Sequence, residues 1–170
     1  MPDLPAVPIR PLLPEDVEDV VAVSLAADTL FAEAGLVLPP DDPRAMLREA
    51  RWVLVAHSPV RGLAALTVLD GAAHLEQLAV HPDHGRRGVG SALLEAACAF
   101  ARERGFAAMT LTTFRNVGWN APWYARRGFA ELPRERWGPQ LRAQWRTEEA
   151  AGIMVAPRIA MRRPLDGSPG

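Results

Sequence analysis

Residues 75–94 read LEQLAVHPDHGRRGVGSALL, an apolar segment followed by a glycine-rich turn and a second apolar segment. The first segment, begun by His74, predicts a strand to Val80, because short apolar runs bounded by Pro and Gly are typical of buried strands. We predict a helix from the turn to about Arg104, ended at Gly105, where a left-handed cap residue is expected. Apolar residues recur on one face of that helix, at Val89, Leu93, Ala97 and Phe100.

The turn between this strand and this helix is suited to an anion. The first N–H groups of a helix have no partner within it, and the helix dipole adds partial positive charge. Gly88 and Gly90 have no side chains to keep a pyrophosphate away, and Arg86 and Arg87 can add charge-assisted contacts. The alternative is a tight turn without a ligand. The Gly-Lys-Ser/Thr ending of nucleoside-triphosphate loops and the third glycine of dinucleotide loops are absent.

Patterns on either side of this unit predict the remaining elements. The order is β-α-α-β-β-β-α-β-α-β-β, an α/β arrangement of the α+β type with a mixed sheet. Asp70-Gly71 predicts a hairpin, and Leu141, Trp145 and Glu148 indicate an additional helix between Pro139 and Ala151. Strands are expected at residues 7–10, 52–56, 62–69, 107–113 and 158–162, helices at 14–25, 41–48 and 118–127, and loose Pro- and Gly-rich ends at 2–8 and 164–170.

Composition excludes several classes of function. The 170 residues, 49% hydrophobic, fit one domain over residues 1–170 with a sizeable core. A net charge of −1 argues against nucleic acid as a partner, and no apolar run reaches the roughly 18 residues that span a membrane. The N-terminus has no signal-peptide pattern, so we expect a cytoplasmic protein. Cys98 is the single cysteine, predicted to fill the core, and we expect no metal site.

A second motif makes the interpretation specific. Residues 119–129, WNAPWYARRGF, resemble the segment of the GNAT superfamily that ends in Tyr, three residues, Gly-Phe. Residues 75–94 resemble the acyl-CoA-binding strand, loop and helix of the same superfamily. The likeness covers roughly residues 9–132 and the last strand. The family loop begins with Gln or Arg where this chain has Gly85, so binding of the pyrophosphate here rests on backbone amides and the two arginines.

This resemblance implies a GNAT fold, with a mixed, mostly antiparallel sheet flanked by helices, and acetyl-CoA as cosubstrate. It places Leu78, Ala79 and Val80 beside the pantetheine arm, which pairs with them like an added strand. Asn120 is a further contact to the coenzyme or, alternatively, a helix cap. The pyrophosphate is assigned to the turn residues Arg86, Arg87, Gly88, Val89, Gly90 and Ser91.

The resemblance also suggests the catalytic groups. Tyr124, the single tyrosine, stands where many GNAT enzymes protonate the departing thiolate, and the alternative is an aromatic ring that only packs. Glu76 stands where relatives place a general base. The alternatives to a general base are that Glu76 is an ion-pair partner or an anchor for a cationic substrate. His74 shares a strand face with Glu76 but is more plausibly a surface residue at the end of a hairpin.

The predicted activity is transfer of acetyl from acetyl-CoA to the primary amine of a small molecule, by direct attack in a ternary complex. The alternatives are a protein or peptide N-acetyltransferase and a non-catalytic acyl-CoA-binding module. The helix at 139–151 is a candidate lid, and homodimers are common in the family, so a homodimer is one expected state. Acceptor-pocket walls are expected from Asp28, Phe31, Glu33, Trp137, Leu141 and Trp145, unless the tryptophans only anchor the extra helix.

Overall fold

Seven strands form one sheet in the computed structural model, which describes residues 6–167. Their order across the sheet is β1-β2-β3-β4-β5-β7-β6, and β4 with β5 is the parallel pair. The strands are β1 (Ile9–Pro11), β2 (Trp52–Ala56), β3 (Gly62–Leu69), β4 (Ala72–Val80), β5 (Ala108–Phe114), β6 (Ala130–Glu131) and β7 (Arg158–Pro164). The helices are α1 (Val17–Glu33), α2 (Pro43–Glu49), α3 (Val89–Glu103), α4 (Ala121–Ala125) and α5 (Pro139–Ala150).

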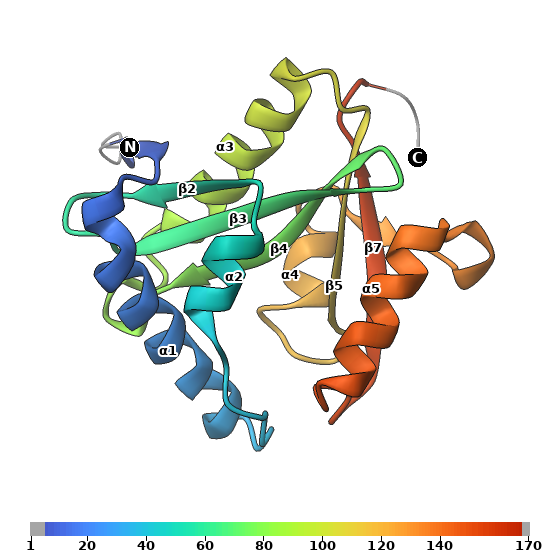
Figure 1. Cartoon of the computed structure of the whole chain (residues 1–170), viewed down its shortest axis with the longest axis horizontal. Helices are drawn as coiled ribbons and strands as arrows, with labels where there is room; N and C mark the ends of the chain where they lie inside the picture. Colours follow the sequence, from blue (N-terminus) through green and yellow to red (C-terminus); the bar gives the residue numbers. More distant parts are fainter. Residues whose placement is uncertain (1–5, 168–170) are drawn as a thin grey trace.

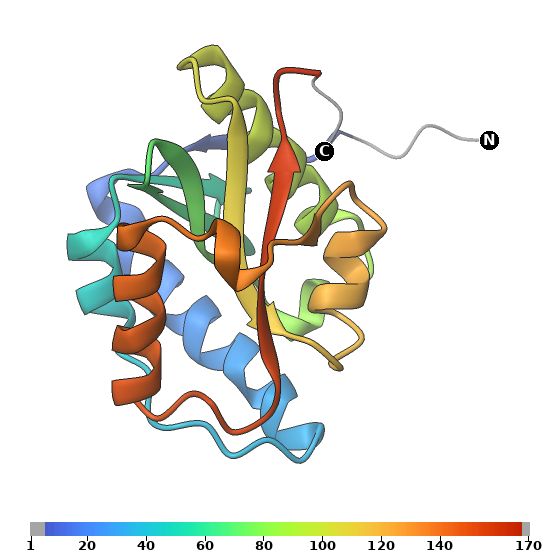
Figure 2. The same cartoon turned by 90° about the vertical axis from the view of Figure 1, so that its right-hand side faces the viewer.

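Helices cover both faces of the sheet. Helices α1, α2 and α5 lie on the face turned to the viewer in Figure 1, and α3 and α4 lie behind it. Figure 2 shows the two layers from the side, with the sheet between them. We call these the α1 face and the α3 face. The predicted fold class is confirmed, and α5 is the additional helix that the spacing of Leu141, Trp145 and Glu148 indicated. Within residues 6–167, no helix is long and apolar enough to cross a membrane.

The main core lies under the α3 face. Leu93, Leu94 and Ala97 of α3 are fully buried against Leu66, Met109 and other strand residues, as the helical stripe predicted. Cys98 is buried in the same cluster, which confirms that it fills the core. Burial raises the pKa of its thiol to about 11, so the thiol stays protonated and unreactive at neutral pH.

Strands β4 and β5 part soon after they meet. They are paired only at Ala73 with Met109 and at His74 with Thr110. Strand β3 follows β4 along its whole length, and β7 follows the whole of β5. The remainder of β4, residues 75–80, therefore has one edge without a strand partner, facing an opening in the sheet.

A β-bulge lies beside this opening. Leu75 pairs with Leu66 and Gln77 pairs with Ala65, so Glu76 is one extra residue in β4. Gln77 donates a hydrogen bond from Nε2 to Ser24 Oγ of α1 at 2.8 Å, which places its side chain on the α1 face. Glu76 is exposed and is coupled electrostatically to carboxylates of α2 and α5, which lie on that face. The bulge thus presents two consecutive polar side chains to the α1 face.

Helix α5 is fixed to the sheet by a distant hairpin. Asp70 and Gly71 form the predicted two-residue turn, with φ of 52° and 76°. The Asp70 carboxylate accepts hydrogen bonds from the N–H groups of Gln140 and Leu141, both at 2.9 Å. A Cβ at Gly138 would lie 2.3–2.6 Å from that carboxylate, so only glycine fits there. Asp70 therefore caps a helix that begins 69 residues later in the sequence.

Some predicted boundaries are wrong. Segment 164–170 was expected to be loose, but Pro164 belongs to β7 and Leu165 is buried, with its N–H bonded to Ala107 O at 2.7 Å. Helix α4 is shorter than the predicted 118–127, because Asn120 has a non-helical backbone and Gly128 has a φ of 89°. Residues 1–5 and 168–170 of the expected loose ends lie outside the described residues.

Replacing Asp70 tests the cap. We expect Asp70→Ala to lower the free energy of unfolding by about 1–2 kcal/mol, because two N–H groups of α5 lose their acceptor. Asp70→Asn should cost less, since asparagine keeps an acceptor oxygen and tolerates positive φ. Urea unfolding at neutral pH measures both variants. Equal stability of Asp70→Ala and the parent would contradict the cap.

Candidate active site

The turn before α3 carries a row of free N–H groups. Arg86 and Gly88 have φ of 61° and 79°, and such left-handed residues turn successive amides toward one side. Ala92 is the first helix residue whose N–H is bonded, to Gly88 O at 3.0 Å. Within the described residues, the N–H groups of residues 88–91 have no hydrogen-bond acceptor. The turn therefore fits a pyrophosphate of the kind that acetyl-CoA carries.

The two glycines of the turn, Gly88 and Gly90, differ in whether the fold itself requires glycine at that position. Gly88 needs its positive φ, although a Cβ there would meet nothing within 4 Å. At Gly90 a Cβ would make only ordinary contacts, 3.6 Å from Val80 and 3.7 Å from Trp123. Packing therefore does not explain why residue 90 has no side chain. A ligand that approaches the backbone does explain it.

A third arginine lies near the turn. Arg127, at the end of α4, donates from Nε to Ser91 Oγ at 3.1 Å and stacks on the Trp123 ring at 3.8 Å. Arg86 and Arg87, which the sequence singled out, are exposed. Nothing in the sequence indicated a role for Arg127. Residues 91 and 127 are far apart in the chain, and their spacing does not predict that their side chains meet. The fold thus adds one cation to the edge of the turn.

The free edge of β4 leads from the turn toward the centre of the sheet. Leu78, Ala79 and Val80 pair with β3 on one side only, and β5 has already diverged on the other. Leu78 and Val80 pack against the core of the α3 face. This strand edge can accept an extended, amide-containing chain, which agrees with the sequence prediction for the pantetheine arm.

Tyr124 lies on the α3 face of the sheet. It is 9% exposed and packs edge-on against Trp123 and Phe129, with ring centroids 5.1 and 5.5 Å away. Burial raises the pKa of its phenol well above the ordinary value of 10, so the hydroxyl is protonated at neutral pH. The side chain therefore both packs in the core and keeps a proton that it could donate.

Asn120 links α4 to the end of β5. Its Oδ1 accepts a hydrogen bond from Thr113 Oγ1 at 2.7 Å and a longer one from Phe114 N at 3.4 Å. It occupies the N-cap position of α4, but its side chain does not cap the helix. The cap alternative is therefore wrong for the side chain, and Asn120 instead positions the turn that precedes Tyr124.

Carboxylates gather on the α1 face around the opening. Partial loss of hydration beside the neighbouring helices raises the pKa of Glu76, although its side chain keeps exposed surface, and the negative charges of Glu148 and Glu49 raise it further. Burial also raises the pKa of Asp28 to about 6, with Asp41 contributing. Helix α1 contacts β4 through Ser24, one turn before Asp28, and reaches Phe114 of β5 one turn after it, through Phe31. Asp28 thus lies between these contacts, over the region where β4 and β5 part.

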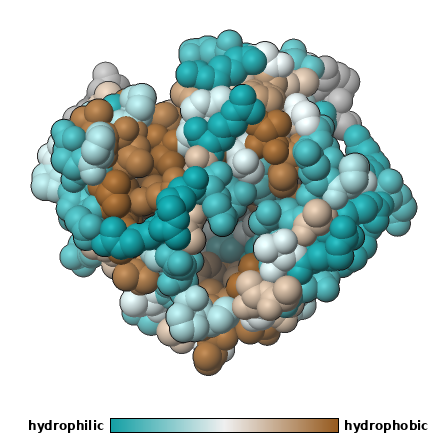
Figure 3. Space-filling view, viewed as in Figure 1, coloured by the Kyte–Doolittle hydropathy of each residue, from teal (hydrophilic) through white to brown (hydrophobic). Residues whose placement is uncertain are grey.

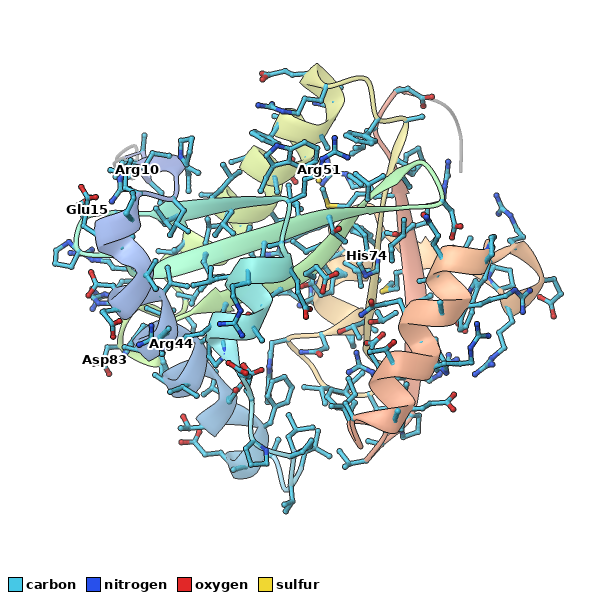
Figure 4. All side chains as sticks on the ribbon, in the orientation of Figure 1. Arg10, Glu15, Arg44, Arg51, His74 and Asp83 are labelled. Carbon is cyan, nitrogen blue, oxygen red and sulfur yellow. The ribbon has the colours of Figure 1, made fainter. Side chains whose placement is uncertain are left out.

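Two sequence predictions for this face need correction. His74 is 1% exposed and bonds Thr110 Oγ1 at 2.8 Å through Nδ1, so it is no surface histidine (Figure 4). Burial lowers its pKa to about 4 and keeps it neutral. Trp137 and Trp145 pack on each other at 4.8 Å and bury α5 on the sheet, as the packing alternative held. Phe31, another expected wall, packs against Phe114 and Trp119, with ring centroids 5.6 and 5.7 Å away.

A cavity of about 330 Å³ lies where β5 ends, lined mainly by apolar residues including Leu36, Phe114, Val117, Trp119 and Pro157. Figure 3 shows a hollow near the middle of this face, between the α1–α2 side and α5, with apolar surface below it. A smaller cavity of about 140 Å³ lies beside the Asp70 turn. Within the described residues, no group of three or more His, Cys, Asp or Glu side chains is placed to hold a metal ion.

Comparison with known proteins agrees with this geometry. Residues 26–129 match the family model described as "Acetyltransferase (GNAT) family". Ribosomal-protein-S18-alanine N-acetyltransferase from Escherichia coli superposes with a TM-score of 0.68 at 20% identity, over 96% of each chain. PaiA N-acetyltransferase from Thermoplasma acidophilum, solved with coenzyme A, gives 0.66 at 18% identity over 93% of this chain and 98% of that one.

N-acetylglutamate synthase from Neisseria gonorrhoeae, in complex with coenzyme A and N-acetyl-glutamate, gives a TM-score of 0.70 at 22% identity. The match covers 94% of this chain but only 35% of the synthase, so the chain spans about a third of that protein. At these identities the structures show the shared fold. The family model covers more than half of the chain, and the chain belongs to the GNAT acetyltransferase family, whose enzymes use acetyl-CoA.

Substitution at Gly90 separates structure from ligand binding. We expect Gly90→Ala to leave the melting temperature equal or slightly higher, because its Cβ fits and alanine favours the helix. Coenzyme A should bind at least about tenfold more weakly by calorimetry, because the methyl group blocks approach to the amides. Gly62→Ala is the contrast, expected to destabilise, since its Cβ would lie 2.8 Å from Leu93 Cδ1. Unchanged coenzyme A affinity in Gly90→Ala would remove the turn from the binding site.

Proposed function

We propose that this enzyme transfers an acetyl group from acetyl-CoA to the primary amine of a small molecule, by direct attack in a ternary complex. One observation carries the proposal: β4 and β5 diverge after two paired residues. The divergence connects the α3 face, where the anion-binding turn and Tyr124 lie, with the α1 face, where Glu76 and Asp28 lie. Donor and acceptor can then approach from opposite sides and meet within the sheet.

The donor side needs a phosphate site, a contact for the pantetheine and a proton source. Support comes from the free amides of residues 88–91, from the unpaired edge at residues 78–80 and from Tyr124. The departing thiolate needs a proton, and its donor must carry that proton at neutral pH. The buried phenol of Tyr124 meets that condition, so we assign it as the general acid.

The acceptor side needs a neutral amine. An ammonium ion loses its proton to a carboxylate more readily when the pKa of the carboxylate is raised toward neutrality. Glu76 has such a shift and is exposed on the bulge at the edge of the opening. We therefore assign Glu76 as the general base, and an anchor for a cationic acceptor is the competing role.

The position of α5 favours a small acceptor over a protein chain. Trp137, Leu141 and Trp145 are buried against the sheet, and Asp70 caps the helix, so α5 is built as a fixed wall. A fixed helix beside the carboxylates narrows the acceptor side, whereas an acceptor polypeptide needs an open groove. The same packing argues against the lid that the sequence suggested.

Release of free coenzyme A tests the function and the acid together. We expect at least one amine of a broad panel, with peptides included for comparison, to release thiol from acetyl-CoA. Tyr124→Phe should lower kcat by about 10²-fold or more, the range of general acid catalysis, with coenzyme A affinity unchanged. A Tyr124→Phe variant with full turnover would remove the acid assignment, and silence of the parent enzyme with every amine would remove the proposed function.

The pH dependence of Glu76→Gln separates base from anchor. A base works only when deprotonated, so activity of the parent should fall as pH drops through the raised pKa of Glu76, above the ordinary value of 4.5. If Glu76 is the base, the Glu76→Gln variant should have a lower kcat and should no longer lose activity as the pH falls, with KM for the amine little changed. If Glu76 is instead an anchor for the substrate, the variant should have a higher KM for the amine and an unchanged kcat. Asp28→Asn is the control, because the pKa of Asp28 is about 6 and its titration could also produce a fall of activity at acid pH.

A further inference from the structure

Arg127 is held against the start of α3 with no carboxylate to neutralise it. Its Nε donates to Ser91 Oγ at 3.1 Å, and its Nη1 donates to the carbonyl oxygen of Trp123, also at 3.1 Å. The guanidinium stacks on the Trp123 ring, 3.8 Å from the centroid. Within residues 6–167, no Asp or Glu side chain forms an ion pair with Arg127. These contacts fix the orientation of a cation whose charge no neighbour balances.

The start of a helix is an unfavourable place for a cation. Ser91 is the third residue of α3, and its N–H is one of those at residues 88–91 that have no acceptor within the described chain. The partial positive charge of the helix dipole is concentrated in this first turn, so it repels a guanidinium. Glu95, one turn further along α3, is already bonded to Arg163, at 2.8 and 3.2 Å. An anion bound between the amides and Arg127 would relieve this repulsion.

The donor groups that such an anion needs are accessible. Nη2 of Arg127 donates to no acceptor in the part of the chain that is described. It keeps accessible surface, since the buried side-chain atoms without partners there belong to His84, Glu148 and Arg158. Ser91 Oγ accepts a hydrogen bond from Arg127, which leaves its own O–H hydrogen free to donate. The N–H and O–H of Ser91 and the free end of Arg127 are therefore neighbouring donors.

A phosphate group suits these donors. Coenzyme A carries a pyrophosphate in its chain and a phosphomonoester on its ribose. A guanidinium forms strong, charge-assisted hydrogen bonds to phosphate oxygens through its planar set of N–H groups. The stack on Trp123 holds that plane at Arg127, whereas Arg86 and Arg87 are exposed. A cation that is already oriented loses less side-chain entropy when the ligand binds.

We propose that Arg127 binds a phosphate group of coenzyme A, together with the amides at the start of α3. The inference rests on the proposed function, since it takes this turn as the site of the cosubstrate, and it adds a binding residue from outside the turn. Tyr124 belongs to α4, and Arg127 follows at the end of the same helix. A phosphate held by Arg127 therefore fixes one end of the coenzyme relative to the helix that carries the proposed acid.

Three forms of the coenzyme identify the phosphate. Calorimetry compares coenzyme A with dephospho-coenzyme A, which lacks the ribose phosphate, and with pantetheine, which lacks every phosphate. We expect Arg127→Gln to weaken coenzyme A at least about tenfold and to leave pantetheine unchanged, because a hydrogen bond to a charged group is lost. An equal loss for dephospho-coenzyme A assigns Arg127 to the pyrophosphate, and no loss assigns it to the ribose phosphate. Unchanged affinity for coenzyme A, or an equal loss for pantetheine, would overturn the proposal.

Matched variants separate charge from packing. Arg126→Gln, at the adjacent exposed position, should leave the affinity for coenzyme A unchanged. An equal loss in Arg126→Gln would show that only net charge matters and would overturn the role of Arg127. If melting curves show that Arg127→Gln does not fold, Arg127→Met replaces it, because its unbranched side chain can still pack on the Trp123 ring.

Salt gives a second measure of the charge. At about 1 M NaCl, where the Debye length is about 3 Å, the difference in coenzyme A affinity between the parent and Arg127→Gln should shrink. A structural bolt between α3 and α4 would give the same difference at low and high salt, and that result would contradict a phosphate contact. In turnover, Arg127→Gln should raise KM for acetyl-CoA and leave kcat little changed.

Binding and turnover distinguish this inference from the function on which it rests. If Arg127→Gln weakens coenzyme A but no amine releases thiol from acetyl-CoA, the phosphate contact stands and the catalytic proposal fails. If Gly90→Ala weakens coenzyme A and Arg127→Gln does not, the turn remains the coenzyme site and the role of Arg127 is wrong.

Discussion

The early divergence of β4 and β5 is the constraint on which the rest of the site depends. Two paired residues, Ala73 and His74 on β4, hold the strands together, and beyond them each strand is supported only by its outer neighbour. The buried hydrogen bond between His74 and Thr110 lies at the last paired position. A continuous sheet would separate the two layers of helices, so the proposed reaction between groups on opposite faces depends on this divergence.

Each face contributes a different chemistry to this opening. On the α3 face, free amides and arginines lie at the start of α3, and the protonated Tyr124 is held in the core. On the α1 face, carboxylates from α1, β4 and α5 surround the opening, and their mutual repulsion and burial raise the pKa values of Glu76 and Asp28. Basic groups on the proposed donor side and acidic groups on the proposed acceptor side have the charges that an anionic coenzyme and a cationic amine would require.

The position of α5 shows how a distant contact shapes the acceptor side. Asp70, in the turn between β3 and β4, satisfies two N–H groups of α5, and Gly138 leaves room for its carboxylate. The tryptophans of α5 then bury against β7 and the segment after β6. These contacts bring Glu148 to Thr112 and Arg158, with which it forms a nearly buried ion pair. A helix that looked like a lid from its sequence is thereby part of the fixed frame.

Local sequence was enough to determine most elements, the Asp70–Gly71 hairpin, the glycine-rich turn before α3 and the family, because glycine conformation, helix capping and apolar spacing act over a few residues. The tertiary structure alone decided the burial of His74, the contact of Arg127 with Ser91, the side-chain bond of Asn120 to β5 and the ion pair of Glu148 with Arg158. Each of these joins residues from separate elements. Their distances and desolvation arise only when the sheet brings those elements together, so no local pattern records them.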